Sequence, residues 1–220
     1  MNIIKTHEEI TGEFEDKLID WCTFYRRNIH RFVEHYLGIK LYLYQKIMLY
    51  LMNLCPTVVL LCSRAVGKSF ITALYACCVC ILYPGSKVVA TAKRKKTIKL
   101  LITEKIEKEL MNLSPNLRRE IKKINTNNND VEVIFHNGSS FVVQPCNDDA
   151  RGARSTILIV DEFRQCDKTI IDAVFSPMEI QRQPQYLMNP KYEHLREEPR
   201  EIYLSSAYYK SHWMWQTIKD

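Results

Sequence analysis

Short apolar runs alternate with helix-like stretches along most of the chain. Residues 57–62 are apolar and partly β-branched, which is typical of a strand buried in a parallel sheet. After a turn at Gly67, an apolar stretch up to Leu82 predicts a long helix. Residues 87–92 repeat the strand pattern and precede a basic helix that reaches about Leu113. The first half of the chain therefore alternates buried strands with helices.

Two more strands and a hairpin are predicted in the second half. Asn137-Gly138 is a strong hairpin signal, and residues 131–136 and 139–144 flank it as strands. Residues 155–161 form an apolar run that ends in a carboxylate, and residues 201–205 read as another strand. This order predicts an α/β fold with a mainly parallel central sheet flanked by helices, plus one antiparallel hairpin.

The N-terminal part is predicted to be helical. Residues 7–37 are rich in helix formers and aromatic residues and stop near Gly38, and residues 42–54 form a second helix that Pro56 ends. We therefore divide the chain into an N-terminal helical region, 1–55, and a core, 56–220.

Composition fits one ordinary globular domain. The chain has 220 residues, of which 46% are hydrophobic and 25% charged, so it can bury a core and is neither disordered nor fibrous. Its longest apolar run, 70–83, is too short to cross a bilayer, and the start of the chain turns acidic instead of resembling a secretory signal. We expect no membrane association.

The charge is unevenly distributed. The net charge is +6, but residues 87–123 hold twelve basic and four acidic side chains, so this segment carries +8 and the rest of the chain −2. Such a field either attracts a polyanion or is the solvated face of a charged helix.

Eight cysteines raise the question of a disulfide or metal framework. The only close group, Cys77-Cys78-Val79-Cys80, lies in an apolar helical stretch, and no second Cys/His pair has zinc spacing. We expect free, buried thiols.

A phosphate-binding loop is predicted between the first strand and its helix. Gly67-Lys68-Ser69 match the end of the G-x-x-x-x-G-K-[ST] pattern, and Cys62 replaces its first glycine. Backbone amides near Gly67 would hold the β-phosphate, Lys68 would bridge the β- and γ-phosphates, and Ser69 would bind Mg²⁺.

Two adjacent carboxylates follow the strand at 155–161. Asp161 stands at the carboxyl end of that strand, where ligands bind in open α/β sheets, and is predicted to hold Mg²⁺ through water. Glu162 is then placed to activate the attacking water as a general base. The loop and this pair predict a P-loop ATPase of the additional-strand, catalytic-glutamate (ASCE) type.

Together these motifs resemble the large terminase subunit, the ATP-driven motor that packages DNA into viral capsids. The family's loop typically reads S-R-x-x-G-K-[ST] and often lacks the first glycine. Ser63-Arg64-Ala65-Val66-Gly67-Lys68-Ser69 matches it, and these residues are expected to bind ATP. The resemblance assigns Arg64 the role of a cis arginine that contacts the γ-phosphate, or pairs with Glu162 when the site is empty.

The resemblance assigns roles to three further elements. Gln45, within residues 41–48, is similar to the family's adenine-recognition residue. Arg151, before Gly152, resembles a trans-acting arginine that reaches a neighbouring subunit's ATP, with Arg154 as the alternative. The string Ser205-Ser206-Ala207 looks like the coupling motif, whose hydroxyls sense the γ-phosphate.

Because this family acts on DNA, the resemblance predicts a DNA-binding function for the basic segment. We expect sequence-independent contact with the phosphates of double-stranded DNA from residues 93–99, whereas Lys and Glu at 104–109 fit solvated pairs. The expected DNA-contacting residues are Lys93, Arg94, Lys95, Lys96 and Lys99.

The resemblance also implies partners and a location. It implies a homo-oligomeric ring on a portal or procapsid, a small terminase subunit, a monomer in isolation, and the cytoplasm of a host cell. Large terminases usually continue into a nuclease domain, for which no room remains after residue 205, so no DNA cleavage is expected.

Two other functions fit some of the same residues. A helicase-type motor also combines a glutamine, a P-loop and an Asp-Glu pair, although Asp161-Glu162-Phe163-Arg164 lacks the usual helicase continuation. A DNA-binding or assembly module that does not hydrolyse ATP is the second alternative.

Overall fold

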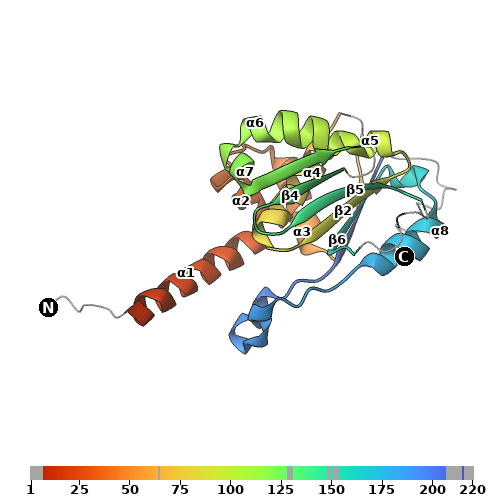
Figure 1. The fold of residues 1–220 in the computed structure, drawn as a ribbon. Helices are drawn as coiled ribbons and strands as arrows, with labels where there is room; N and C mark the ends of the chain where they lie inside the picture. Colours follow the sequence, from red (N-terminus) through yellow and green to blue (C-terminus); the bar gives the residue numbers. More distant parts are fainter. Residues whose placement is uncertain are drawn as a thin grey trace.

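A single mixed sheet organises the molecule (Figure 1). The computed structural model describes residues 7–63, 65–127, 131–147, 150, 154–206 and 215. The sheet has seven strands in the order β1-β7-β6-β2-β5-β4-β3. The strands are β1 Thr57–Leu61, β2 Lys87–Ala92, β3 Ile121–Thr126, β4 Val131–Phe135, β5 Ser140–Pro145, β6 Ile157–Asp161 and β7 Arg200–Ser205.

Strands β1, β7, β6, β2 and β5 run parallel, and β4 pairs antiparallel with both β5 and β3. The predicted hairpin is confirmed, since Gly138 has φ 82° in the turn between β4 and β5. Strand β7 lies between β1 and β6, so one strand separates the strand before the phosphate loop from the strand that ends in Asp161. The predicted α/β fold with a mainly parallel sheet is therefore confirmed.

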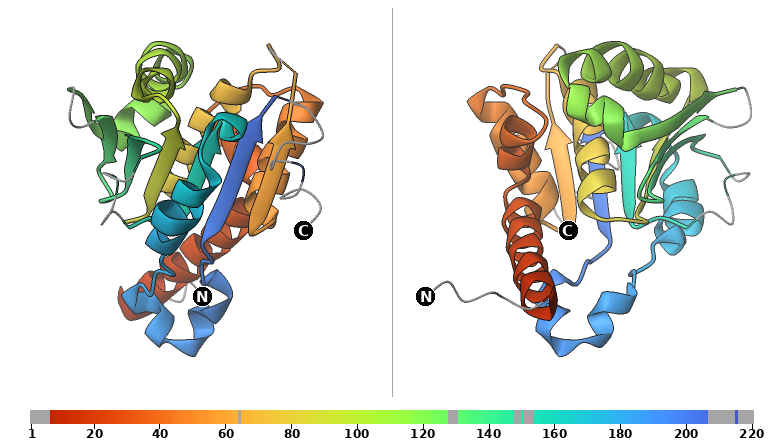
Figure 2. Two further views of the ribbon diagram at one scale, coloured as in Figure 1. Left: turned by 90° about the vertical axis from the view of Figure 1, so that its right-hand side faces the viewer. Right: turned by 60° about the vertical axis from the view of Figure 1, so that its left-hand side comes forward.

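Helices cover both faces of the sheet (Figure 2). Those before and around the central strands are α1 His7–Arg27, α2 Ile29–His35, α3 Leu43–Leu54, α4 Lys68–Leu82, α5 Lys95–Leu100, the π-helical η1 Leu101–Leu110, α6 Met111–Leu113 and α7 Pro115–Glu120. Between β6 and β7 follow η3 Phe163–Gln165, α8 Lys168–Ile170, η4 Ile171–Phe175, η5 Ser176–Met178, η6 Gln185–Met188 and η7 Pro190–Leu195. None of the described helices is long and apolar enough to cross a membrane.

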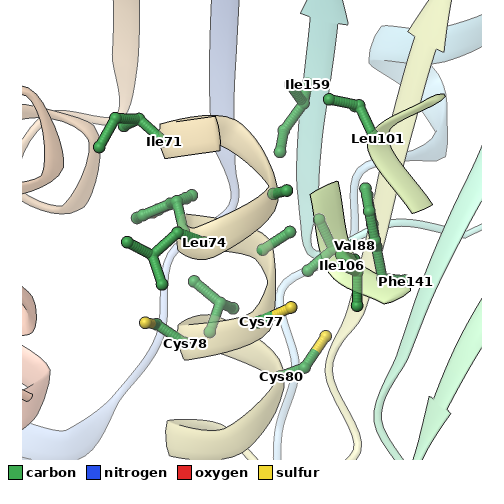
Figure 3. Close-up of a cluster of buried hydrophobic side chains, with 14 of the residues drawn as sticks. Ile71, Leu74, Cys77, Cys78, Cys80, Val88, Leu101, Ile106, Phe141 and Ile159 are labelled. Atoms are coloured by element: carbon green, nitrogen blue, oxygen red, sulfur yellow. The ribbon is translucent and has the colours of Figure 1, made fainter. Parts of the chain in front are cut away.

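Alternating side chains divide the core into two layers. Val88, Ile159 and Ile202 pack on the face that α4 covers, whereas Val89 and Leu158 pack on the face covered by η3 and η4. In Figure 3 the α4 side chains lie against side chains of β2, β5, β6 and η1. Helices α2 and α3, from the predicted N-terminal helical region, contribute to the same layer as α4.

Three local predictions needed correction. The predicted helix over 7–37 is two helices, because the backbone leaves helical geometry at Asn28 (φ −124°, ψ 58°), whose side-chain Nδ2 donates to Phe24 O at 2.9 Å. The basic helix is π-helical over η1. Strand β3 was not predicted, because Ile121 and Ile124 are its only apolar residues and it lies at the sheet edge with Lys122 and Lys123 exposed.

Truncation of a core side chain in α4 is expected to be costly. Leu74 is fully buried in the layer between α4 and the sheet, so Leu74→Ala should lower the free energy of unfolding by about 3 kcal/mol through lost burial and a residual cavity. Urea denaturation followed by circular dichroism measures this loss. Leu43, which is 74% exposed, is the matched control, and Leu43→Ala should change stability by less than about 0.5 kcal/mol.

Candidate nucleotide site

The predicted phosphate-binding loop lies between β1 and α4, at the carboxyl end of the parallel strands. Gly67 has φ 82° and immediately precedes Lys68, the first residue of the 15-residue helix α4. Ala65 also takes a left-handed conformation, with φ 66°. These turns direct the chain into α4, so the unpaired amides and positive dipole end of the helix face the loop, as anion binding requires.

The two ends of the loop are held together by hydrogen bonds. The Lys68 Nζ donates to the carbonyl of Cys62 at 3.2 Å, and the Cys62 N–H donates to the carbonyl of Ser205 at 3.0 Å. Cys62, which stands where the pattern has its first glycine, thus anchors the loop through its backbone, and its side chain is only half-buried.

Asp161 lies at the same edge of the sheet. It ends β6 and pairs with Leu204 of β7, whose next residue, Ser205, pairs with Leu61 at the end of β1. Only 8% of Asp161 is exposed. The parallel register therefore brings the phosphate loop, Ser205 and Asp161 together from three separate parts of the chain.

Burial changes the chemistry of Asp161. Desolvation and the neighbouring Glu162 charge raise the pKa of Asp161 to about 6, against the lowering effects of the Glu162 N–H and the Lys68 ammonium. The Glu162 N–H donates to Asp161 Oδ1 at 3.0 Å. A carboxylate held this way gains from a cation beside it, and carboxylate and hydroxyl oxygens are ligands that Mg²⁺ accepts.

Asp161 and Ser69 are thus suited to a metal ion that also binds substrate phosphates. The described residues contain no group of three or more His, Cys, Asp or Glu side chains that could hold a metal alone. Mg²⁺ usually binds through one or two protein oxygens, water and phosphates, so this sparse set of ligands fits it.

Glu162 is held in an unusual backbone conformation. Its φ of 48° and ψ of 44° are left-handed, which is rare outside glycine and clusters at functional sites. Arg164 Nε donates to Glu162 Oε2 at 3.2 Å, and both side chains are partly exposed. Sequence reasoning overlooked Arg164 and predicted Arg64 as the partner of Glu162; Arg64 lies outside the described residues.

Ser205 is buried at the end of β7, next to the loop. Its Oγ has no hydrogen-bond partner among the described residues, although it is inaccessible to solvent. Buried hydroxyls nearly always have partners, so this orphaned group is poised for a ligand, a water or a moving neighbour. Ser206 is half-buried, and Ala207 lies outside the described residues.

Gln45 lies beside the loop, although 22 positions separate it from Gly67. A Cβ built on Gly67 would meet Gln45 Nε2 at 3.8 Å, and Gln45 Oε1 accepts from the Tyr42 N–H at 3.0 Å. Both residues line a hollow of about 460 Å³, with Phe70 of α4 and the exposed Tyr42 ring also on its wall. The hollow adjoins the loop and combines an aromatic wall with the polar amide of Gln45, as small-molecule pockets do.

Of the two arginines predicted as trans-acting candidates, the structure describes only Arg154. Arg151 lies outside the described residues. Arg154 is exposed just before β6, at the opposite end of that strand from Asp161, and so lies far from the loop of its own chain.

The basic residues after β2 are not equivalent. Lys93, Arg94 and Lys96 are exposed, whereas Lys95 is half-buried. Lys99 donates through Nζ to the carbonyl of Thr126 at 2.6 Å and so is turned toward the end of β3. The expectation for residues 104–109 is confirmed: Lys105 pairs with Glu109 at 2.7 Å and Lys108 with Glu104 at 2.8 Å.

All eight cysteines are free, as expected. Cys77, Cys78, Cys80 and Cys166 are buried, but the other four are half-buried, so the expectation of burial holds for only part of the set. Cys166 hydrogen-bonds to Cys146, which lowers the pKa of the Cys146 thiol.

Comparison with solved structures agrees with this geometry. An ATPase-domain variant of the large terminase of Thermus phage P74-26 superposes with a TM-score of 0.61 at 15% identity, over 86% of this chain and 74% of that one. The large terminase of bacteriophage HK97 superposes with a TM-score of 0.60 at 15% identity, over 88% of this chain. The chain has the fold of a large terminase ATPase domain.

This fold agrees with the predicted α/β architecture, and one strand, β7, lies between β1 and β6. At such low identity the likeness establishes the fold and leaves the activity to the site residues. The chain spans 41% of the HK97 large terminase. No protein-family model matches the sequence, and no curated protein does.

Removal of the buried charge at Asp161 is expected to stabilise the fold above neutral pH. The folded-state pKa of Asp161 exceeds the unfolded value, so its contribution to stability falls as pH rises from about 4 to about 6 and stays low above that range. Asp161→Asn should therefore raise the free energy of unfolding at pH 8 by about 2 kcal/mol and leave it nearly unchanged at pH 4. Urea melts of both proteins at the two pH values measure this difference, and equal stability at pH 8 would contradict it.

Proposed function

We propose that this chain is an ATP-hydrolysing motor domain that moves double-stranded DNA, as in viral DNA packaging. The observation that carries the proposal is the register of β1, β7 and β6, which places the phosphate loop, Ser205 and the Asp161-Glu162 pair at one edge of a terminase-type sheet. A loop, a metal-site carboxylate and an adjacent second carboxylate are the parts that P-loop ATPases require.

In this proposal the loop residues and Gln45 bind ATP. The helix amides after Gly67 and the Lys68 ammonium hold the phosphates, with Lys68 leaving Cys62 O, and Gln45 presents its amide to the base. Tyr42 and Phe70 supply apolar surface for the base. Mg²⁺, when bound at Ser69 and Asp161, neutralises charge on the β- and γ-phosphates.

Glu162 would act as the general base that orients and deprotonates water. Its Oε2 accepts a hydrogen bond from Arg164 Nε, and its left-handed backbone ends the strand β6 just before it. Arg64 and Arg151, an arginine of the same chain and one offered to a neighbouring copy, would complete the charge around the γ-phosphate.

Coupling would begin at Ser205. Its carbonyl accepts from the Cys62 N–H, so a change at the loop is transmitted directly to β7. The orphaned Ser205 Oγ would sense the γ-phosphate, with Ser206 and Ala207 continuing the link. A homo-oligomeric ring on a portal and a small terminase subunit complete the proposed assembly in the host cytoplasm.

The exposed cations after β2 are the proposed DNA contacts. Lys93→Gln/Arg94→Gln/Lys96→Gln should weaken binding to double-stranded DNA about tenfold at low salt and flatten the salt dependence, because three phosphate contacts are lost. Lys105→Gln/Lys108→Gln removes two cations already paired with glutamates and should leave binding within about twofold. Fluorescence anisotropy with labelled duplexes of two sequences measures both variants.

A motor of this kind is tested by hydrolysis in the presence of DNA. ATP turnover should rise with added duplex, independently of its sequence, while a duplex with a single-stranded tail stays paired. Strand separation would favour a helicase instead, and bound DNA without any ATP turnover at high protein concentration would favour an assembly module.

A further inference from the structure

A second hollow lies near the amino end of β7, whereas the phosphate loop lies at the carboxyl ends of the parallel strands. It has a volume of about 350 Å³ and lies among α1, the end of α3, Tyr83 after α4, η7 and the start of β7. In both views of Figure 2, α1 and the segment around η7 lie together below the sheet, and Thr23 of α1 hydrogen-bonds His194 of η7. Strand β7 separates Arg200 from Ser205 by about 17 Å, so this hollow is distinct from the nucleotide site.

Its lining is strongly cationic. Four arginines, Arg26, Arg27, Arg196 and Arg200, reach it from three elements, and none of the described residues that line it is Asp or Glu. Four guanidinium groups lining one small hollow, of which Arg196 alone forms an ion pair with a described carboxylate, that of Glu193, are a typical setting for a phosphate oxyanion.

Two of these arginines are already fixed in place. The guanidinium carbons of Arg26 and Arg200 lie 4.4 and 5.9 Å from the centre of the Tyr83 ring. Arg26 Nε also donates to the carbonyl of Leu82 at 3.0 Å, and its Nη1 donates to the carbonyl of Leu195 at 3.3 Å. Like charges are thus held close together around one ring, an arrangement that a bound anion would stabilise.

The nearby carboxylates offset only part of this charge. Burial raises the pKa of Glu197, and the nearby charges of Arg182, Arg26 and Arg200 partly oppose this. Its carboxylate accepts from Arg182, an arginine outside the hollow, at 3.2 Å and from the Tyr186 hydroxyl at 3.3 Å. Glu193 accepts two hydrogen bonds from Arg196, at 2.6 and 2.8 Å. Arg27 makes no ion pair with any described residue, so an exposed guanidinium stands at the mouth of the hollow.

Part of the rim of the hollow is apolar. Tyr50 and Leu54 of α3 line it with 40% and 61% of their surface exposed. An aromatic ring and an aliphatic side chain beside the arginines offer surface for an organic group, which inorganic phosphate lacks. The volume suits a small molecule and is too confined for the side of a DNA duplex.

We propose that this hollow binds a small phosphate monoester that carries an aromatic or apolar group, with Arg27 and Arg196 at its entrance and Arg26 and Arg200 at its base. This site would act apart from the proposed ATPase reaction.

Phenyl phosphate is the probe, and Lys68→Ala protein is the background, because this variant weakens the nucleotide site. We expect saturable binding by calorimetry with a dissociation constant of about 1 mM or tighter, and no binding of phenol. Arg27→Glu should weaken the binding at least about tenfold, and Arg27→Glu/Arg196→Glu should abolish it, since each reverses an entrance charge. Arg119→Glu, an exposed arginine of α7 elsewhere on the surface, should change it by less than about twofold.

Three results would overturn the proposal. These are no saturation up to about 10 mM phenyl phosphate, equal binding by Arg27→Glu and Arg119→Glu, or binding of a 5′-phosphorylated DNA end without binding of phenyl phosphate. Arg27 is exposed at the end of α1, so its variants should keep the thermal melting curve of the parent. None of these outcomes depends on ATP hydrolysis, so they are separate from tests of the motor function.

Discussion

Lys68→Ala is expected to weaken ATP binding about 100-fold and to reduce hydrolysis to background. The Lys68 ammonium is the only side-chain cation of the described loop, and it lies close enough to Asp161 to lower that carboxyl's pKa. The substitution removes a charge-assisted hydrogen bond to the β- and γ-phosphates. It also removes the hydrogen bond from Lys68 Nζ to the Cys62 carbonyl that links the two ends of the loop. Titration of a fluorescent ATP analogue measures the affinity.

Lys122→Ala is the matched control for this experiment. Lys122 is exposed on the edge strand β3, distant in the sheet from β1, so the substitution should leave affinity within about twofold. Melting curves of both variants establish that the fold is kept. Unchanged ATP affinity in folded Lys68→Ala would mean that the loop is not the phosphate site.

Glu162→Gln is expected to keep ATP binding and to lower turnover about 100-fold or more. An amide of the same shape can still accept a hydrogen bond from Arg164, but it cannot take a proton from water. Rapid-quench measurement of phosphate release, with binding followed on the same samples, separates these two effects.

Asp172→Asn is the control for this charge change. Asp172 lies in η4 and pairs with Lys168 on the surface, so its neutralisation should change turnover by less than about twofold. Arg164→Gln then separates the roles of the pair: if Glu162 acts only as an ion-pair partner, both substitutions give the same loss. The base assignment predicts that Arg164→Gln keeps the larger share of turnover.

Much of the fold follows from sequence patterns with strong local causes. The strands before the loop and before Asp161 are continuous apolar runs, and the Asn137-Gly138 turn has φ 82° at its glycine as expected. The position of β7 between β1 and β6 is set by tertiary packing and cannot be predicted from residues 201–205 alone. It was expected only because the phosphate-loop pattern and the Asp-Glu pair together predicted a fold with an additional strand.

The rest depended on strand and helix packing, or on local backbone geometry, that the sequence pattern does not signal. Strand β3 has too few apolar residues to signal itself and forms because β4 offers a partner edge. The proximity of Gln45 to Gly67 arises where α3 packs beside α4, and the Glu162–Arg164 pair depends on a left-handed turn at a glutamate. The sequence indicates the Glu162–Arg164 pair only by the position of a basic residue two places after Glu162.

Steady-state phosphate release from ATP, measured over a range of protein concentrations with and without Mg²⁺, tests the central claim most directly. We expect turnover that requires Mg²⁺, rises more steeply than protein concentration if copies share an arginine, and disappears in both Lys68→Ala and Glu162→Gln. Turnover that persists in both folded variants, or no Mg²⁺-dependent turnover at any protein concentration with DNA present, would contradict it.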